Sequence, residues 1–159
     1  MPAADRVAAL SVQLIDVHQA LRNRLASLRA EAAGNAGAPD DLLRHDLLSH
    51  CLGFCAAIHT HHSGEDGQLL PALRAAEPSL APVIDKLIED HGLFAGILQK
   101  IGELMDPASM RAEPAALVRE LDGLTAILES HFSFEERRIA AALDTLGPGA
   151  WSAEVFAPG

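Results

Sequence analysis

The chain carries four stretches in which apolar residues recur at spacings of three and four, the period of an amphipathic α-helix. Each stripe must be buried, and four stripes in a chain of 159 residues suit one bundle in which each helix covers the others. We therefore expect an all-α, up-down-up-down four-helix bundle in a single domain spanning residues 1–159. The stripes consist of Leu14, Leu21, Leu25 and Leu28; Leu47, Cys51, Phe54 and Ile58; Ile84, Leu87, Phe94, Leu98, Ile101 and Met105; and Leu117, Leu121, Leu124 and Leu128.

Glycine and proline mark the breaks between the expected helices. We expect helices over about residues 5–31, 40–71, 79–105 and 114–144, with Asp40 as an amino-terminal cap. The segment 34–39, the Glu-Pro-Ser sequence at 77–79 and the segment 106–114 separate them. Regular structure should end at the Gly-Pro-Gly sequence 147–149, within a tail of residues 145–159 whose Trp151 is a candidate to pack on one end of the bundle.

Six ionisable side chains fall in phase with these apolar stripes: His18, His61, Glu65, His91, His131 and Glu135. An unpaired carboxylate or imidazolium is costly to bury, and two neighbouring carboxylates repel until one takes up a proton. A pair of cations removes that conflict, and histidine nitrogen with carboxylate oxygen suits iron, manganese or zinc. Inward-facing His and Glu on facing helices therefore predict a dinuclear metal site inside the bundle.

The spacing within the pairs favours the same interpretation. His61 and Glu65, like His131 and Glu135, are four residues apart, which places both side chains on one helix face. His62 points about 80° to 120° away from this direction, so we expect it at the rim, as an extra ligand, as a support for a ligand or as a surface residue. Solvent exposure is expected for His45 and His59, and a core or subunit contact for His50.

Composition restricts the partners. A formal charge of −10 with only 12 Lys and Arg argues against nucleic acid or an anionic membrane, which both reward basic patches. The amino terminus lacks a signal-peptide pattern, and no apolar stretch reaches the roughly 18 residues of a membrane helix, so we expect a cytoplasmic protein. Cys51 and Cys55 are four apart on one expected helix, which favours free thiols.

The chain resembles the hemerythrin-like, HHE cation-binding family in His18, the run His61-His62-Ser-Gly-Glu65-Asp66, His91 and the run His131-Phe-Ser-Phe-Glu135-Glu136. The resemblance covers roughly residues 5–144. It implies two non-haem iron ions bridged by Glu65, Glu135 and an oxo or hydroxo group, and completed by the histidines. Oxygen-carrying members have a further histidine where this chain has Ala95, so a position stays open unless His62 supplies the fifth imidazole.

The sequence therefore predicts a di-iron protein that binds or reduces dioxygen, peroxide or nitric oxide, and the open position makes simple oxygen transport a weaker hypothesis. Three alternatives stay open: a non-enzymatic sensor or iron buffer with the same site, a zinc or manganese site with little redox role, and a bundle whose histidines are satisfied without metal. No catalytic residue is assigned, and neither enzymatic activity nor a homo-oligomer is decided by the sequence.

Overall fold

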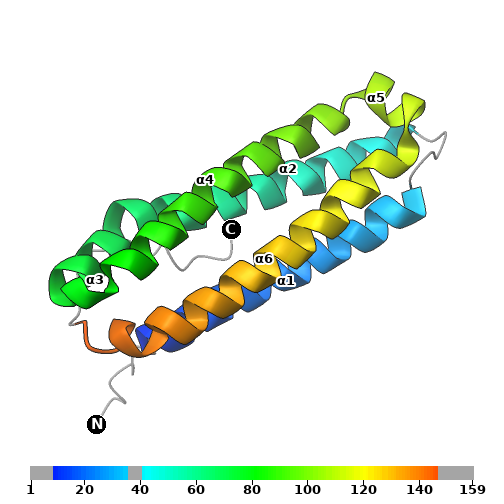
Figure 1. Cartoon of the computed structure of the whole chain (residues 1–159). Helices are drawn as coiled ribbons and strands as arrows, with labels where there is room; N and C mark the ends of the chain where they lie inside the picture. Colours follow the sequence, from blue (N-terminus) through cyan, green and yellow to red (C-terminus); the bar gives the residue numbers. More distant parts are fainter. Residues whose placement is uncertain (1–8, 36–40, 147–159) are drawn as a thin grey trace, which may run out of the picture.

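The computed structural model describes residues 9–35 and 41–146, and these form helices joined by short connections (Figure 1). The four long helices are α1 (Leu10–Asn35), α2 (Asp41–Gly64), α4 (Ala81–Leu104) and α6 (Pro114–Leu143). They run alternately up and down, with α1 packed against α2 and α6, and α4 packed against the same two helices. The all-α four-helix bundle is thereby confirmed.

The second expected helix, over residues 40–71, differs from the structure in its second half. After α2 the chain makes a wider π-helical turn, η1 (Glu65–Leu69), and continues as α3 (Leu70–Ala76) through Pro71. The backbone N–H of Leu70 donates to the carbonyl oxygen of Glu65, five residues back, so one extra residue is accommodated in this turn. A short 3₁₀ segment, η2 (Pro78–Leu80), then leads into α4.

The segment 106–114, expected only as a break between two helices, contains the short helix α5 (Pro107–Ala112). The Asp106 carboxylate caps this helix by accepting from the backbone N–H groups of Ala108 and Ser109, at 3.0 and 3.3 Å. Aspartate before proline is a recognisable helix start, since proline suits the first turn. The expectations for Asp40 and Trp151 lie outside the described residues.

The apolar interior consists of two clusters, one toward each end of the bundle. Leu21, Phe54 and Leu124 belong to the larger cluster, and Leu14 and Leu87 to the smaller one. Leu14 and Leu21 stand about one turn on either side of His18 on α1. A layer of buried polar side chains therefore lies between the two apolar clusters.

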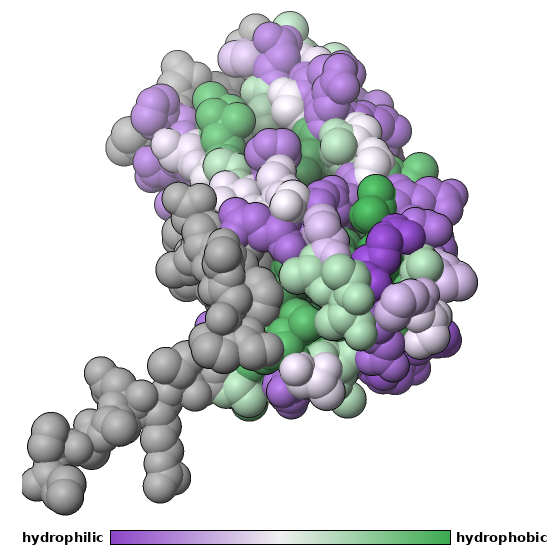
Figure 2. All heavy atoms as spheres, turned by 90° about the vertical axis from the view of Figure 1, so that its left-hand side faces the viewer, coloured by the Kyte–Doolittle hydropathy of each residue, from purple (hydrophilic) through white to green (hydrophobic). Residues whose placement is uncertain are grey.

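Near α3, polar and apolar side chains are interspersed (Figure 2). The large apolar residues that are exposed are distributed over the four long helices: Val12, Ile15, Leu52, Ile88, Leu93 and Ile127. Within residues 9–35 and 41–146, no helix combines the length and apolar character needed to cross a bilayer. Cys51 and Cys55 are free thiols, as expected.

Candidate metal centre

Seven polar side chains are buried in the described part of the chain, and all of them meet in the layer between the apolar clusters. None is more than 6 % exposed: His18, His61, His62, Glu65, His91, His131 and Glu135. The six residues that the apolar stripes singled out are all among them. Helical phase alone therefore identified six of the seven buried polar positions.

His62 is the seventh, and its expected position at the rim is wrong, since it is only 5 % exposed. The reason is that α2 contacts α1 on one side and α4 on the other, so two of its faces point inward. His61 lies toward His18 of α1, whereas the His62 ring stacks on His91 of α4, with centroids 4.0 Å apart. Adjacent residues about 100° apart on one helix thus both reach the interior.

The first group of donor atoms lies around His18 and His61. Their Nε2 atoms are 3.1 Å apart. His61 Nε2 is 2.9 Å from Glu65 Oε1, and His18 Nε2 is 3.6 Å from Glu135 Oε2. Three helical segments and the π-turn contribute to this group, which brings two imidazoles and two carboxylates together.

The second group consists of His62, His91 and His131, whose ligand atoms all lie within 4.8 Å of one another. His91 Nε2 is 3.3 Å from Glu65 Oε2, and His131 Nε2 is 3.4 Å from Glu135 Oε2. His91 belongs to α4 and His131 to α6, so this second group lies on the side of the buried layer formed by these two helices.

Glu65 and Glu135 each contact both groups. Glu65 directs Oε1 to His61 and Oε2 to His91. Glu135 Oε2 faces both His18 and His131. The arrangement is therefore two sets of imidazoles, one of two and one of three, with two carboxylates between them.

Burial and mutual repulsion shift the titration of the two carboxyl groups in opposite directions. Burial, followed by the nearby charge of Glu65, raises the pKa of Glu135 well above its ordinary value. Burial also opposes ionisation of Glu65, but His61, Glu135 and His62 together outweigh it and lower the pKa of Glu65 well below the usual range. Without cations, the pair thus holds one proton and one negative charge near neutral pH.

Three of the imidazoles are held in the neutral form. Burial lowers the pKa values of His18 and His62, and it lowers that of His131 to about 4, with His91 adding to the effect. A neutral imidazole has a lone pair on one nitrogen, which is the form that binds metals. These histidines are therefore ready to act as ligands at neutral pH.

Three of the histidines are supported from behind by carboxylates. The distances from Nδ1 are 2.9 Å for His18 to Glu136, 2.7 Å for His91 to Asp66 and 3.3 Å for His131 to Asp90. A carboxylate accepts a hydrogen bond there, which places the proton on Nδ1 and leaves Nε2 as the donor to a metal.

Two of these carboxylates are themselves held by cations. Arg22 Nη1 donates to Glu136 at 2.9 Å, and Lys86 Nζ donates to Asp90 at 2.5 Å. The sequence indicated Asp66 and Glu136 as acids that follow the His-Glu pairs, and it placed Asp66 at the rim, where it was a candidate support for a ligand, an extra ligand or a surface residue. It gave no indication of Asp90, because this residue of α4 supports His131 of α6.

The remaining histidines lie away from the centre. His45 and His59 are exposed, as expected. The side chain of His50 is 64 % exposed and its Nδ1 lies 2.7 Å from Glu31, so the expectation of a core position is wrong. Ala95 is exposed on α4.

The donor atoms left without hydrogen bonds provide a test of whether the residues suit a pair of metal ions. Among the described residues, every buried side-chain nitrogen or oxygen that lacks a partner belongs to this centre: His62 Nε2, His91 Nε2, His131 Nε2 and both oxygens of Glu65 and of Glu135. Donors about 2.1 Å from one ion lie roughly 3.0 to 3.4 Å apart in octahedral or tetrahedral geometry. The contacts of the imidazoles with the shared carboxylates and of His18 with His61, from 2.9 to 3.6 Å, are close to that spacing, and the ligand atoms of His62, His91 and His131 lie within 4.8 Å of one another.

Comparison with known proteins agrees with this geometry. The hemerythrin HHE cation binding domain matches residues 10–143, which extend from the start of α1 to the end of α6. No curated protein and no solved structure matched the chain. Because the match covers the whole bundle, the chain belongs to the hemerythrin HHE cation-binding domain family.

Proposed function

We propose that this chain is a non-haem di-iron protein that binds or reduces a small oxygen or nitrogen species: dioxygen, peroxide or nitric oxide. One observation carries the proposal. The buried donor atoms without hydrogen-bond partners are the Nε2 atoms of the group of three imidazoles and the oxygens of the two carboxylates that connect it with the group of His18 and His61. Leaving so many buried polar atoms unpaired would strongly destabilise the fold, so cations are the natural partners.

The proposed ligands divide unequally. His18 and His61 would hold one ion, His62, His91 and His131 the other, and the carboxylates of Glu65 and Glu135 would be shared by both. The side with two imidazoles has fewer protein donors, which leaves room there for an exogenous ligand. His62 thus takes the part of the fifth imidazole, for which Ala95 offered no side chain.

A pair of iron ions would supply redox chemistry to this site, because each ion can change its oxidation state. The chain's own contribution is to position the donors and to limit access. Ile58, Phe94 and Leu128 are at most 2 % exposed and belong to the apolar cluster beside the centre. The Phe132 ring stacks on His18 at 4.1 Å between centroids. Such an apolar lining excludes bulk water, favours small uncharged species and tunes the redox potential of bound iron.

The test is to load the full chain with Fe(II) without oxygen, count iron per chain, and then add dioxygen, hydrogen peroxide or a nitric oxide donor. The proposal predicts two iron ions per chain and near-ultraviolet absorption after oxidation. It also predicts peroxide turnover above that of free iron. Metal-free protein and the variant His131→Ala serve as controls, and neither should give the oxidised spectrum.

The possible outcomes separate the alternatives. Two iron ions with the expected spectrum but with no turnover above free iron would favour a sensor or an iron buffer. Tight binding of zinc or manganese, with no stable iron pair, would reject the redox proposal.

A further inference from the structure

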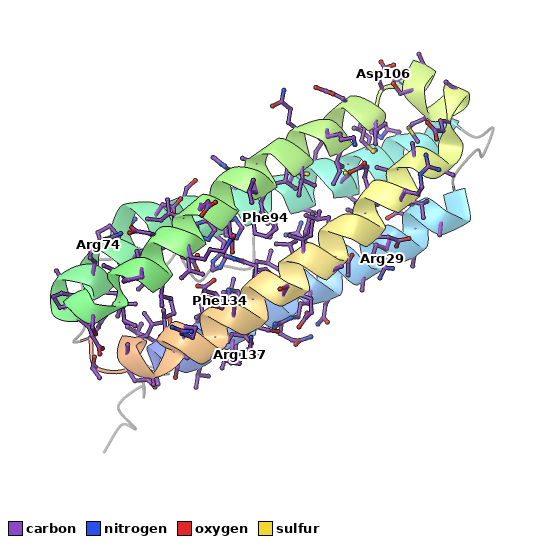
Figure 3. The ribbon with its side chains drawn as sticks, in the orientation of Figure 1. Arg29, Arg74, Phe94, Asp106, Phe134 and Arg137 are labelled. Carbon is purple, nitrogen blue, oxygen red and sulfur yellow. The ribbon has the colours of Figure 1, made fainter. Side chains whose placement is uncertain are left out.

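A pocket of about 450 Å³ opens between α4 and α6, next to His131. Its volume lies within the range typical of small-molecule sites, roughly 300 to 1,000 Å³. The side chains that give it its character are Lys86, Leu93, Phe94, Ile127, Phe134 and Arg137. Figure 3 labels Phe94 on α4, and Phe134 and Arg137 along α6.

The pocket is polar at one end and apolar at the other. Because α4 and α6 run in opposite directions, the contact between Asp90 and His131 fixes their register. Lys86, before Asp90 on α4, and Arg137, after His131 on α6, therefore lie toward the same end. Ile127 and Leu93 lie toward the other end, about 15 Å from Arg137 along α6 at 1.5 Å per residue.

Two large apolar side chains are exposed to solvent at the apolar end of the pocket. Leu93 is 59 % exposed and Ile127 is 46 % exposed, and both line the pocket. Phe94 is buried beneath them, at 1 % exposure. An apolar chain lying here would remove both exposed side chains from water, which is favourable in proportion to the area covered.

Of the two described cations at the polar end, Arg137 is left for a ligand. Lys86 is paired with Asp90, whose other oxygen faces His131 Nδ1, so the lysine and aspartate charges offset each other. Arg137, in contrast, makes no ion pair with any residue that the structure describes. Its planar guanidinium suits a carboxylate, to which it can donate two parallel hydrogen bonds.

We propose that this pocket binds a small amphipathic carboxylate of the medium-chain fatty-acid class. The carboxylate pairs with Arg137, and the alkyl chain lies along Phe134 and Phe94 to Ile127 and Leu93. The occupant then touches the outer side of His131, whose Nε2 belongs to the proposed metal centre. The binding itself needs no metal, so it does not depend on the proposed di-iron function.

The experiment is an NMR titration of the full chain with octanoate, carried out on metal-free and zinc-loaded protein. We expect saturable 1:1 binding to the metal-free chain, with shifts confined to residues 86–94 of α4 and 126–137 of α6. Arg137→Gln should weaken binding about tenfold, the loss typical of one charged hydrogen-bonded contact. The matched variant Arg29→Gln removes an arginine of α1 that pairs with Asp122 of α6, neither of which lines the pocket, and it should bind octanoate as the parent does.

A second pair of variants tests the apolar end. Ile127→Asp should abolish binding, whereas Ile88→Asp, at a similarly exposed isoleucine of α4 that does not line the pocket, should retain it. Neutral 1-octanol should bind at least about tenfold more weakly than octanoate.

Three results would overturn the proposal: no saturable octanoate binding, equal losses in the two variants of either pair, or octanol binding as tightly as octanoate. Binding to the metal-free chain upholds the proposal even if iron never binds. Conversely, a filled iron site without octanoate binding rejects only the pocket.

Discussion

Glu136 on α6 supports His18 on α1 from behind, with its Oε1 2.9 Å from His18 Nδ1. The proton of the imidazole is thereby held on Nδ1, and Nε2 is turned toward His61 and Glu135. A carboxylate on one helix thus fixes the tautomer of a proposed ligand on another. Arg22 holds Glu136 in turn, and it also pairs with Glu129, which does not contact His18.

Replacing Glu136 by alanine should weaken metal binding about 10- to 100-fold, the usual effect of losing the partner that orients a histidine ligand. Competition titrations with a coloured chelator would measure this. Glu129→Ala is the matched control, since it removes the other carboxylate on Arg22, and it should change the affinity less than threefold. Glu136→Gln should restore part of the affinity, because its amide oxygen accepts the same hydrogen bond. Equal affinities for Glu136→Ala and the parent chain would show that the contact has no orienting role.

His61→Ala and His131→Ala should each lose metal, because each removes a donor that lies 3.4 Å or less from a shared carboxylate. His45→Ala and His59→Ala should keep it, since both side chains are exposed. Elemental analysis of the four purified variants provides the measurement. Equal loss in all four would contradict the assignment of the centre.

His62→Ala distinguishes a ligand from a packing residue. If His62 binds metal, the variant should retain one ion per chain, since the set of two imidazoles stays complete with its carboxylates. The control is His59→Ala, three residues earlier on the same helix but exposed. Two ions retained in His62→Ala would mean that this imidazole only stacks on His91.

Removing the metal should lower the melting temperature. Cations that bind the folded chain alone stabilise it by mass action, by about 2.7 kcal/mol when the free ion is present at 100 times Kd. Thermal unfolding with and without a chelator measures the shift, and His131→Ala should show little of it. An unchanged melting temperature in the parent chain would mean that the buried donors are satisfied without metal.

Acid should destabilise the metal-free protein through its buried histidines. Burial lowers the pKa of His131 from 6.5 to about 4, so below pH 6.5 the unfolded chain takes up a proton that the folded chain does not. Through His131 alone, the free energy of unfolding is therefore highest above pH 6.5 and falls by about 3 kcal/mol between pH 6.5 and 4. The raised pKa of Glu135 acts in the opposite sense, because the folded chain keeps a proton that the unfolded chain loses.

The comparison that isolates this effect is between His131→Leu and His59→Leu, each measured by urea unfolding of metal-free protein at several pH values. The slope of stability against pH should become flatter for His131→Leu only. A parent-like slope in that variant would show that His131 is protonated in the folded chain.

Much of the bundle could be predicted because apolar residues at helical spacing indicate which face of each helix is buried. Leu14, Leu21 and Leu121 had to face inward, and His18 and His131 share their phase, so the structure buries all of them. The same reasoning was wrong for His62, because it assumed that only one face of each helix points into the bundle. A helix at the corner of a bundle has two inward directions, toward α1 and toward α4.

Features that depend on contacts between helices were not predictable from local pattern. The support of His131 by Asp90 joins residues 41 positions apart, and only the register of α4 against α6 brings them together. The π-turn at Glu65 follows residues that read as ordinary helix, so its extra residue left no periodic signal. The α5 helix was different, since Asp106 before Pro107 is a local pattern typical of a helix start.

The most direct test of the central claim is an anomalous-difference map from crystals of the iron-loaded full chain, recorded at the iron absorption edge. The account predicts two adjacent peaks within the buried layer, one beside His18 and His61, the other beside His62, His91 and His131, with Glu65 and Glu135 between them. A map with no peak among these residues, from crystals grown with excess Fe(II), would contradict it.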